Sequence, residues 1–166
     1  MEHDELPLSF GFDAPAHWSW LEPGERERRG TCDADLCVMT DDGGDPARFV
    51  RGVIELPIVD ASDPDDATFL IGVWSSLSEA SFESLLELRG GVDGAGQGPW
   101  FGWLSNRLPV YPETLSLPTD VIPREPELRP LIRVQAGEHP LVVDQAGITF
   151  GRAVELSESW LHLLDA

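Results

Sequence analysis

The side chains of this sequence that could do chemistry are one histidine, two arginines and three aromatic residues. His139 stands directly before Pro140 and Leu141. A turn of this kind can present an imidazole to a pocket as an acid, a base or a hydrogen-bond donor. The competing interpretation, which we favour, is that the ring only holds a loop in place through hydrogen bonds, because placed polar groups are often structural.

Arginine and aromatic side chains together could line a groove for a peptide or a small anion. Guanidinium groups attract anions and stack on rings, and tryptophan, tyrosine and arginine dominate many recognition surfaces. With His139, the candidate binding residues are Arg51, Trp74, Trp103, Tyr111 and Arg129. The alternative is that most of these rings belong to the core, with one or two left exposed.

Three further patterns match known sites poorly. The glycine-rich run 94–98 lacks the spacing of a dinucleotide fingerprint and follows an expected helix, which indicates a hinge loop. The acidic runs 41–45 and 60–66 lack the ligand order of a calcium loop, so we interpret them as solvated turns.

Metal binding by the remaining candidate ligands is also disfavoured. Glu155, Glu158 and His162 share one face of an expected helix but have no fourth ligand in the sequence. Cys32 and Cys37 lack the second pair of a structural zinc site, and we expect them to be free thiols. We therefore predict no catalytic residue set, no metal site and no cofactor.

The charge of the chain favours some partners over others. Thirty acidic residues against 11 basic ones give a formal net charge of −19, and every basic residue is arginine. Without lysine, Schiff-base chemistry and the phosphate-binding lysine of a P-loop are excluded. Acidity disfavours nucleic acid and favours a basic protein or a cation. An alternative is that the acidity serves only solubility.

The N-terminal residues predict the compartment. The start of the sequence is acidic and lacks the basic and apolar regions of a signal peptide. No apolar run approaches the roughly 20 residues that a membrane span needs. We therefore expect a cytoplasmic protein that does not enter a membrane.

The length and the hydrophobic pattern predict one α+β domain spanning residues 1–166. With 42% hydrophobic residues, the chain is long enough for one core. We expect a mainly antiparallel β-sheet covered by two or three helices. The strands lie near Leu36, Phe49, Thr68, Trp100 and Leu131, the helices near Phe82 and Phe150, and flexible loops at 41–47, 60–67 and 90–98.

Several local expectations accompany this fold. Asp13 should cap a short helical turn, and Ser78 or Ser81 should cap the helix that ends at Arg89. Gly102, between large aromatic residues, indicates a core strand where another backbone or a ligand passes close. The proline-rich segment 117–129 favours an extended wrapping segment over a central strand.

Motifs along nearly the whole chain resemble one protein family. They are Phe10-Gly11-Phe12-Asp13-Ala14-Pro15, Phe49-Val50-Arg51-Gly52-Val53-Ile54-Glu55-Leu56-Pro57, Gly72-Val73-Trp74-Ser75-Ser76-Leu77-Ser78 and Phe101-Gly102-Trp103-Leu104-Ser105, with shorter matches at 35–38, 108–114, 128–132 and 139–141. The sequence thus resembles the uncharacterised bacterial family called domain of unknown function 2199. The resemblance implies no activity.

One departure from the family concerns the N-terminus. The resemblance implies an opening Cys-x-x-Cys-Gly-x-x-His motif, of which only the histidine has a match, at His3. Either the chain starts late or this member has lost the motif. Cys37 matches the family pattern and Cys32 does not, which argues against a metal site rebuilt from this pair.

Two hypotheses for the function follow. The leading one is a small acidic cytoplasmic module without catalysis that binds a basic partner protein, in the manner of an inhibitor or immunity protein. The alternative is an enzyme or a small-ligand binder whose pocket gathers Arg51, Arg129 and His139 beside Trp74, Trp103 and Tyr111. The sequence leaves the oligomeric state open.

Overall fold

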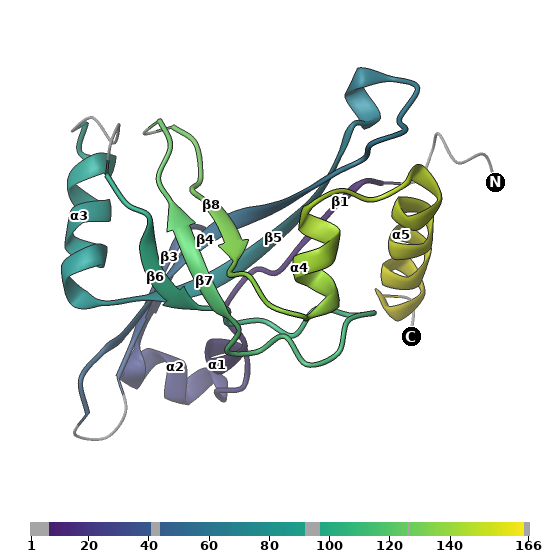
Figure 1. Ribbon diagram of the computed structural model, residues 1–166. Coiled ribbons are helices and arrows are strands. Elements are labelled where there is room, and N and C mark those ends of the chain that lie inside the picture. The colour runs from purple at the N-terminus through teal and green to yellow at the C-terminus, as the bar shows by residue number, and fades with distance from the viewer. Residues whose placement is uncertain (1–6, 41–43, 92–96, 126, 165–166) are drawn as a thin grey trace.

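The computed structural model describes residues 7–40, 44–91, 97–125 and 127–164. These residues form an α+β architecture around one curled, mixed sheet, as Figure 1 shows. Helices α3 (Glu79–Arg89) and α5 (Phe150–Leu164) lie at opposite sides of the sheet, and α1 (Ala16–Ser19) and α2 (Pro23–Arg29) lie beneath it. The expected fold class is therefore confirmed, while the expected covering of the sheet by helices is met only in part.

The sheet combines antiparallel and parallel pairs. Its strands are β1 (Ser9–Gly11), β2 (Gly30–Cys32), β3 (Leu36–Met39), β4 (Ala47–Pro57), β5 (Thr68–Leu77), β6 (Trp100–Trp103), β7 (Pro118–Ile122) and β8 (Leu131–Val134). Their order is β1-β5-β4-β8-β7-β6, with β3 on β4 and β2 on β3. Most pairs are antiparallel, as expected, but β1 with β5 and β8 with β4 are parallel. Parallel partners need long connections, which strand periodicity alone does not indicate.

The helix ends follow the capping rules in part. Ser78 caps α3 by accepting a hydrogen bond from the backbone N–H of Ser81 at 3.1 Å. The prediction for Asp13 is wrong, because α1 begins after Pro15 and has no side-chain cap. A fourth α-helix, α4 (Pro140–Gln145), follows His139 and was not predicted. None of the described helices has the length and apolar character of a membrane span.

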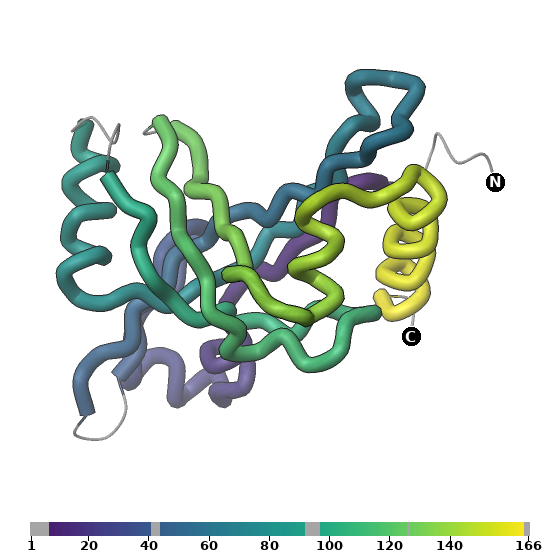
Figure 2. The backbone as a smooth tube through the Cα atoms, viewed as in Figure 1, coloured from purple at the N-terminus to yellow at the C-terminus, as the bar shows by residue number. Residues whose placement is uncertain are grey.

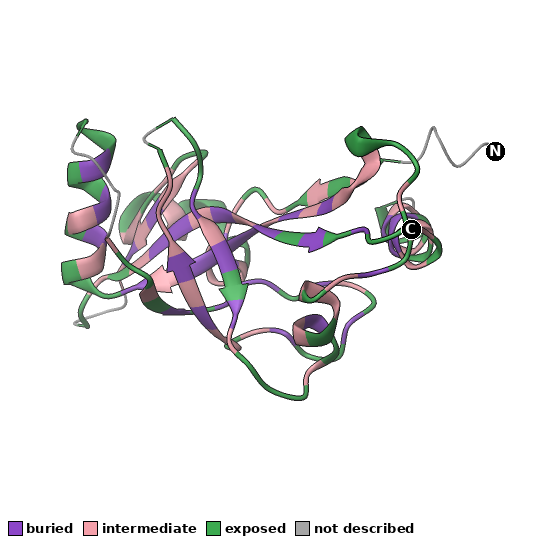
Figure 3. Ribbon diagram, turned by 45° about the horizontal axis from the view of Figure 1, so that its top comes forward, coloured by how far each residue is buried: buried purple, intermediate pink, exposed green. Residues whose placement is uncertain are grey.

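The long β4–β5 hairpin is the centre of the core. Val50, Ile54 and Leu56 of β4 are buried at alternate positions, as the alternating sequence predicts. Helix α5 adds Trp160, whose ring stacks on Phe10 with centroids 5.0 Å apart. Figure 3 shows the buried residues concentrated along the central strands. A smaller cluster of Cys37, Met39, Phe49 and Trp74 lies toward α1.

The sheet curls until β6 meets β5 again. Leu104 forms an antiparallel bridge with Ser75, and the backbone N–H of Trp103 donates to Oγ of Ser76 at 2.9 Å. A Cβ atom added to Gly102 would overlap the carbonyl oxygen of Ser76. The expected close approach of another backbone at Gly102 is thus confirmed, and this contact closes one end of the sheet. The expected position of the strand in the core is wrong for the rings of Phe101 and Trp103, which are about half exposed because only Gly102 faces inward.

The segment after Leu117 corrects one prediction. Residues 118–122 form β7, an internal strand between β6 and β8, and not a wrapping segment. The prolines do not interrupt the ladder, because Pro118 occupies the first strand position and Pro123 follows the last. The prolines therefore mark the two ends of β7, and the residues between them pair with β6 and β8.

Two of the three expected loops fall partly outside the described residues. The loop 60–67 is described and contains the 3₁₀ turn η2 (Pro64–Asp66), with Asp63 as its cap. The loops 41–47 and 90–98 include residues that the structure does not describe.

We predict that Gly102→Ala lowers the free energy of unfolding by about 1–3 kcal/mol, since its methyl group must displace the β5 backbone. Gly24→Ala is the matched control, because a Cβ at Gly24 of α2 meets no atom within 4 Å. That change should be neutral or stabilising by up to about 1 kcal/mol. Urea unfolding of both variants measures the difference, and equal effects would contradict the closure at Gly102.

Candidate functional site

The six residues proposed from the sequence do not form one pocket. Arg51 and Arg129 both line a cavity of about 110 Å³ beside α3. Tyr111 and His139 meet at the start of α4, with ring centroids 6.5 Å apart. Trp74 is completely buried, whereas Trp103 is 49% exposed on β6. The six residues that the alternative hypothesis brings together therefore lie in four separate places. These are the cavity beside α3, the start of α4, the exposed face of β6 and, for Trp74, the core.

His139 holds the backbone at the start of α4. Its Nδ1 accepts a hydrogen bond from the N–H of Leu141 at 3.1 Å, and its Nε2 lies 3.0 Å from the carbonyl oxygen of Pro112. A carbonyl only accepts, so this arrangement fits the neutral ring with its proton on Nε2. Both ring nitrogens are engaged, as the structural interpretation of this histidine predicts.

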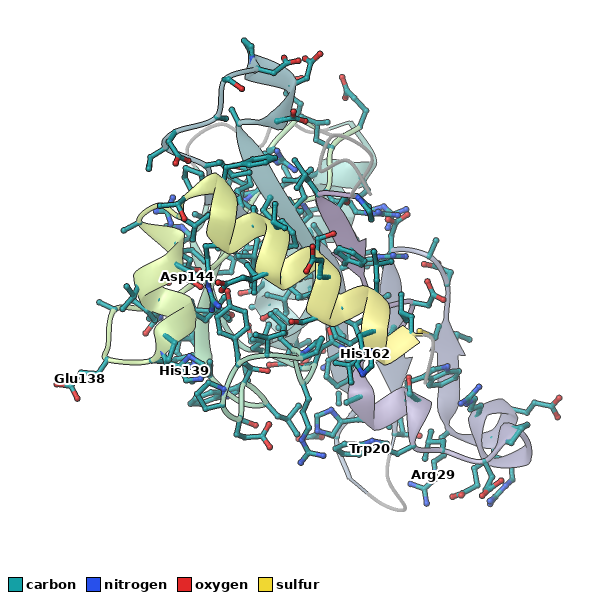
Figure 4. The ribbon with its side chains drawn as sticks, turned by 90° about the vertical axis from the view of Figure 1, so that its right-hand side faces the viewer. Trp20, Arg29, Glu138, His139, Asp144 and His162 are labelled. Carbon is teal, nitrogen blue, oxygen red and sulfur yellow. The ribbon has the colours of Figure 1, made fainter. Side chains whose placement is uncertain are left out.

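Tyr111 is buried next to the same helix. Its hydroxyl donates to Oδ2 of Asp144 at 2.6 Å, and the guanidinium of Arg152 lies over its ring, 5.7 Å from the centroid. Burial, followed by the hydrogen bond and charge of Asp144, raises the pKa of Tyr111. Figure 4 shows His139 and Asp144 at the α4 side of the molecule, distant from Trp20. The group is therefore a structural joint between α4, α5 and the chain before β7.

A larger hollow, which we name the aromatic pocket, lies between α1, the β3–β4 hairpin and β6. Its volume is about 460 Å³. Trp20 and Trp103 line it and are 57% and 49% exposed, and Phe101, 48% exposed, meets Trp103 edge to face at 4.8 Å. The lining consists of His17, Trp20, Leu21, Met39, Asp45, Ala47, Phe49, Ser76, Trp103, Leu104, Ser105 and Ser116. Exposed aromatic side chains grouped around a hollow are typical of recognition sites.

A buried asparagine, Asn106, connects chain segments that border this pocket. Oδ1 of Asn106 accepts the backbone N–H of Trp74 at 2.7 Å, and its Nδ2 donates to the carbonyl oxygen of Ala14 at 3.0 Å. The N–H of Ala16 donates to the carbonyl oxygen of Ser105 at 2.8 Å. Residues 104–117 run out toward α5 and return to β7 (Figure 2). Asn106 thereby joins the chain before α1, β5 and the chain after β6, and α1, β5 and the chain after β6 contribute part of the pocket lining.

Two serine hydroxyls of the aromatic pocket make hydrogen bonds with the backbone. Oγ of Ser76 accepts the N–H of Trp103, and Oγ of Ser105 donates to the carbonyl oxygen of Trp103, both at 2.9 Å. The guanidinium of Arg107 lies 5.1 Å from the centroid of Trp20 and also pairs with Glu113. The pocket therefore offers ring faces and apolar contacts to a ligand, and the hydroxyls of Ser76 and Ser105 serve the fold.

The sequence analysis missed Trp20 and Phe49 as pocket residues. A signal for Trp20 was present, because Trp18 and Trp20 in one helical turn point roughly 200° apart and cannot both face the core. Trp18 packs against the smaller core cluster and Trp20 faces the pocket. A signal for Phe49 was present as well, because it shares a strand face with Arg51 and Glu55. Such a mixed face is typical of a half-exposed sheet or of the floor of a pocket.

The sulfur and carboxylate groups of the described residues do not gather into a metal centre. Within the described part of the chain, no three histidine, cysteine, aspartate or glutamate side chains gather around a point where a metal ion could bind. Cys32 and Cys37 are free and lie opposite each other on β2 and β3. Burial raises the pKa of both thiols, which makes them less reactive at neutral pH. His3 lies outside the described residues.

The fold and the pocket define an α+β protein with a curled mixed sheet and an exposed aromatic pocket. The chain belongs to the family described as "Uncharacterized protein conserved in bacteria (DUF2199)", whose model matches residues 1–148. The resemblance drawn from the motifs is thus confirmed. The matched region contains every residue of the aromatic pocket and ends before α5. No curated protein and no solved structure matches this chain.

We predict that Asn106→Ala lowers the free energy of unfolding by about 1–3 kcal/mol for each buried group that it leaves without a partner. Those groups are the N–H of Trp74 and the carbonyl of Ala14. Ser84→Ala, which removes an exposed hydrogen bond within α3, should change it by less than about 0.5 kcal/mol. Urea unfolding compares the variants, and a loss at Asn106 no larger than at Ser84 would refute this role.

A second prediction concerns alkaline pH. Tyr111 is the one tyrosine of the chain, so the ultraviolet absorbance of tyrosinate reports its ionisation alone. The raised pKa means that the unfolded chain ionises first, near its ordinary value of 10.0, while the folded chain stays neutral. Stability contributed by Tyr111 is therefore complete below pH 10 and is lost as the pH rises toward the folded pKa.

Tyrosinate should accordingly form at higher pH in the native protein than in urea. Asp144→Asn should lower the native midpoint without bringing it to the unfolded value, because burial remains the larger cause. Equal midpoints in the native and unfolded protein would contradict the burial of Tyr111.

Proposed function

We propose that this protein is a non-catalytic interaction module whose aromatic pocket receives an apolar anchor of a basic partner protein. The observation that carries the proposal is the exposure of Trp20 and Trp103 around one hollow, with the exposed ring of Phe101 against Trp103. Large rings that a chain leaves half exposed provide contact area with little loss of side-chain entropy, which is why they dominate recognition surfaces.

The charge of the chain supports a basic partner. A net charge of −19 produces a long-range attraction for positive proteins and a repulsion of acidic ones. The pocket lining itself is mainly apolar, with Asp45 as its carboxylate. The charge then accelerates the encounter, and burial of the anchor in the pocket sets how long the complex lasts.

The proposal also specifies how the module acts on its partner and in which compartment the two meet. A module that covers a basic enzyme at its substrate-binding face would act as an inhibitor or an immunity-type protein. Free thiols at Cys32 and Cys37 suit a reducing compartment, so we place the encounter in the cytoplasm. If the partner is an enzyme, a stoichiometric complex should reduce its activity.

The test is a comparison of three immobilised forms of the protein in lysate of its native host. They are the unchanged chain, the double variant Trp20→Ala with Trp103→Ala, and the control Leu86→Ala, which alters a side chain of α3 that is 45% exposed. We expect a basic protein that the unchanged chain and the control retain at low salt. High salt and the double variant should release it.

The protein so identified is then purified and titrated against the same three forms. The double variant should weaken the dissociation constant at least about tenfold, because anchor residues at hot spots contribute most of the binding energy. The affinity should also fall as salt rises, since ionic screening shortens the range of the attraction. Equal binding by the double variant, or a partner without net positive charge, would overturn the proposal.

A further inference from the structure

A second hollow, which we name the arginine cavity, lies between β4, the end of α3 and residues 127–130. Its volume is about 110 Å³. Arg51, Arg89 and Arg129 line it, so three of the 11 basic residues of a strongly acidic chain share one small cavity. Figure 1 shows the end of α3 next to the connection between β7 and β8. The arginines come from three elements that are far apart in the sequence.

One carboxylate pairs with two of these arginines. Nε of Arg129 donates to Oδ1 of Asp35 at 2.9 Å, and Nη2 of Arg89 lies 3.8 Å from Oδ2 of the same group. A fourth arginine, Arg124, contacts the backbone beside this cavity, since its Nε donates to the carbonyl oxygen of Arg129 at 2.7 Å. Asp35 therefore lies beside two guanidinium groups, and no other side chain or carbonyl of the described residues pairs with either of them.

Arg51 is the most buried member of the group. Its side chain is 17% exposed, its Nη1 donates to the carbonyl oxygen of Ala34 at 3.3 Å, and its Nη2 lies 3.9 Å from the exposed carboxylate of Asp13. Its Nε is buried and makes no hydrogen bond with any described residue. A buried charged donor without a partner is destabilising, and native proteins seldom leave one unsatisfied.

We propose that the arginine cavity binds a small oxyanion, either a phosphate-type group or a carboxylate. Guanidinium groups match both in geometry, because each presents parallel N–H donors to two oxygens. The lining carries three guanidinium groups against two carboxylates, those of Asp35 and Glu127. The carboxylate of Asp13, 3.9 Å from Arg51, lies outside the lining and is fully exposed, so solvent screens its attraction for the guanidinium. A cavity of this size accommodates a small anion and not a nucleotide.

The arginine cavity is independent of the proposed function. It shares no lining residue with the aromatic pocket. The competing interpretation is that the arginines only hold residues 127–130 against β4 through Asp35. The two interpretations differ in one measurable property, because only a binding site gives a saturable response to an anion.

The experiment titrates the protein with inorganic phosphate by calorimetry and follows thermal unfolding at constant ionic strength set with sodium chloride. We expect saturable heat and a rise in the melting temperature, because a ligand that binds only the native state stabilises it. Glycerol phosphate, sulfate and acetate form parallel titrations. Binding of the tetrahedral anions alone identifies a phosphate-type site, and stronger binding of acetate identifies a carboxylate site.

Three variants, each replacing one arginine, test whether the anion binds in the arginine cavity. Arg51→Met keeps the packing of the buried stem, and Arg89→Gln changes a partly exposed position, so at least one should fold normally. Both should weaken anion binding at least tenfold, whereas Arg133→Gln, on the exposed face of β8, should leave it unchanged. The absence of saturable binding of any anion, or equal binding by all variants, would overturn the proposal. The double variant Trp20→Ala with Trp103→Ala should bind the anion as the unchanged protein does.

Discussion

The side chain of Asn106 makes the contacts on which the arrangement of the aromatic pocket depends. It is buried, and it accepts from the backbone of Trp74 while donating to the backbone of Ala14. A buried amide with both ends satisfied fixes position more strongly than apolar contacts, because any displacement leaves polar groups without partners. This one residue therefore sets α1, with Trp20, against the chain that follows Trp103.

The closed sheet explains why large rings remain in solvent on β6. Gly102 lets the backbone of β6 approach β5, and its inward position carries no side chain. Phe101 and Trp103, on either side of it, therefore face outward and are about half exposed. A chain with a net charge of −19 tolerates such an apolar patch, because charge repulsion between copies opposes self-association.

Prediction from sequence succeeded where local chemistry decides structure. The alternation of Val50, Ile54 and Leu56 predicted the buried face of β4, and Ser78 caps α3 as expected. It failed for residues 117–129, where the proline content favoured an extended wrapping segment over a central strand. Residues 118–122 form the internal strand β7, in which proline occupies only the first position. Prediction from sequence also missed α4, whose capping residue is His139, a residue type rarely expected at that place.

The sequence by itself determined the α+β class, the family, the acidic character and the elements whose apolar period is visible along the chain. Only the tertiary structure decided which side chains share a site. Arg51 and Arg129 line one cavity, whereas Trp74 lies in the core and Tyr111 with His139 forms a joint beside α4. The reason is physical. The spacing of apolar residues along the sequence indicates which face of a helix or strand is buried, but the residues that pack against that face come from segments distant in the sequence. The parallel contacts of β1 with β5 and of β4 with β8 are pairings between such segments, and no local sequence signal encodes them.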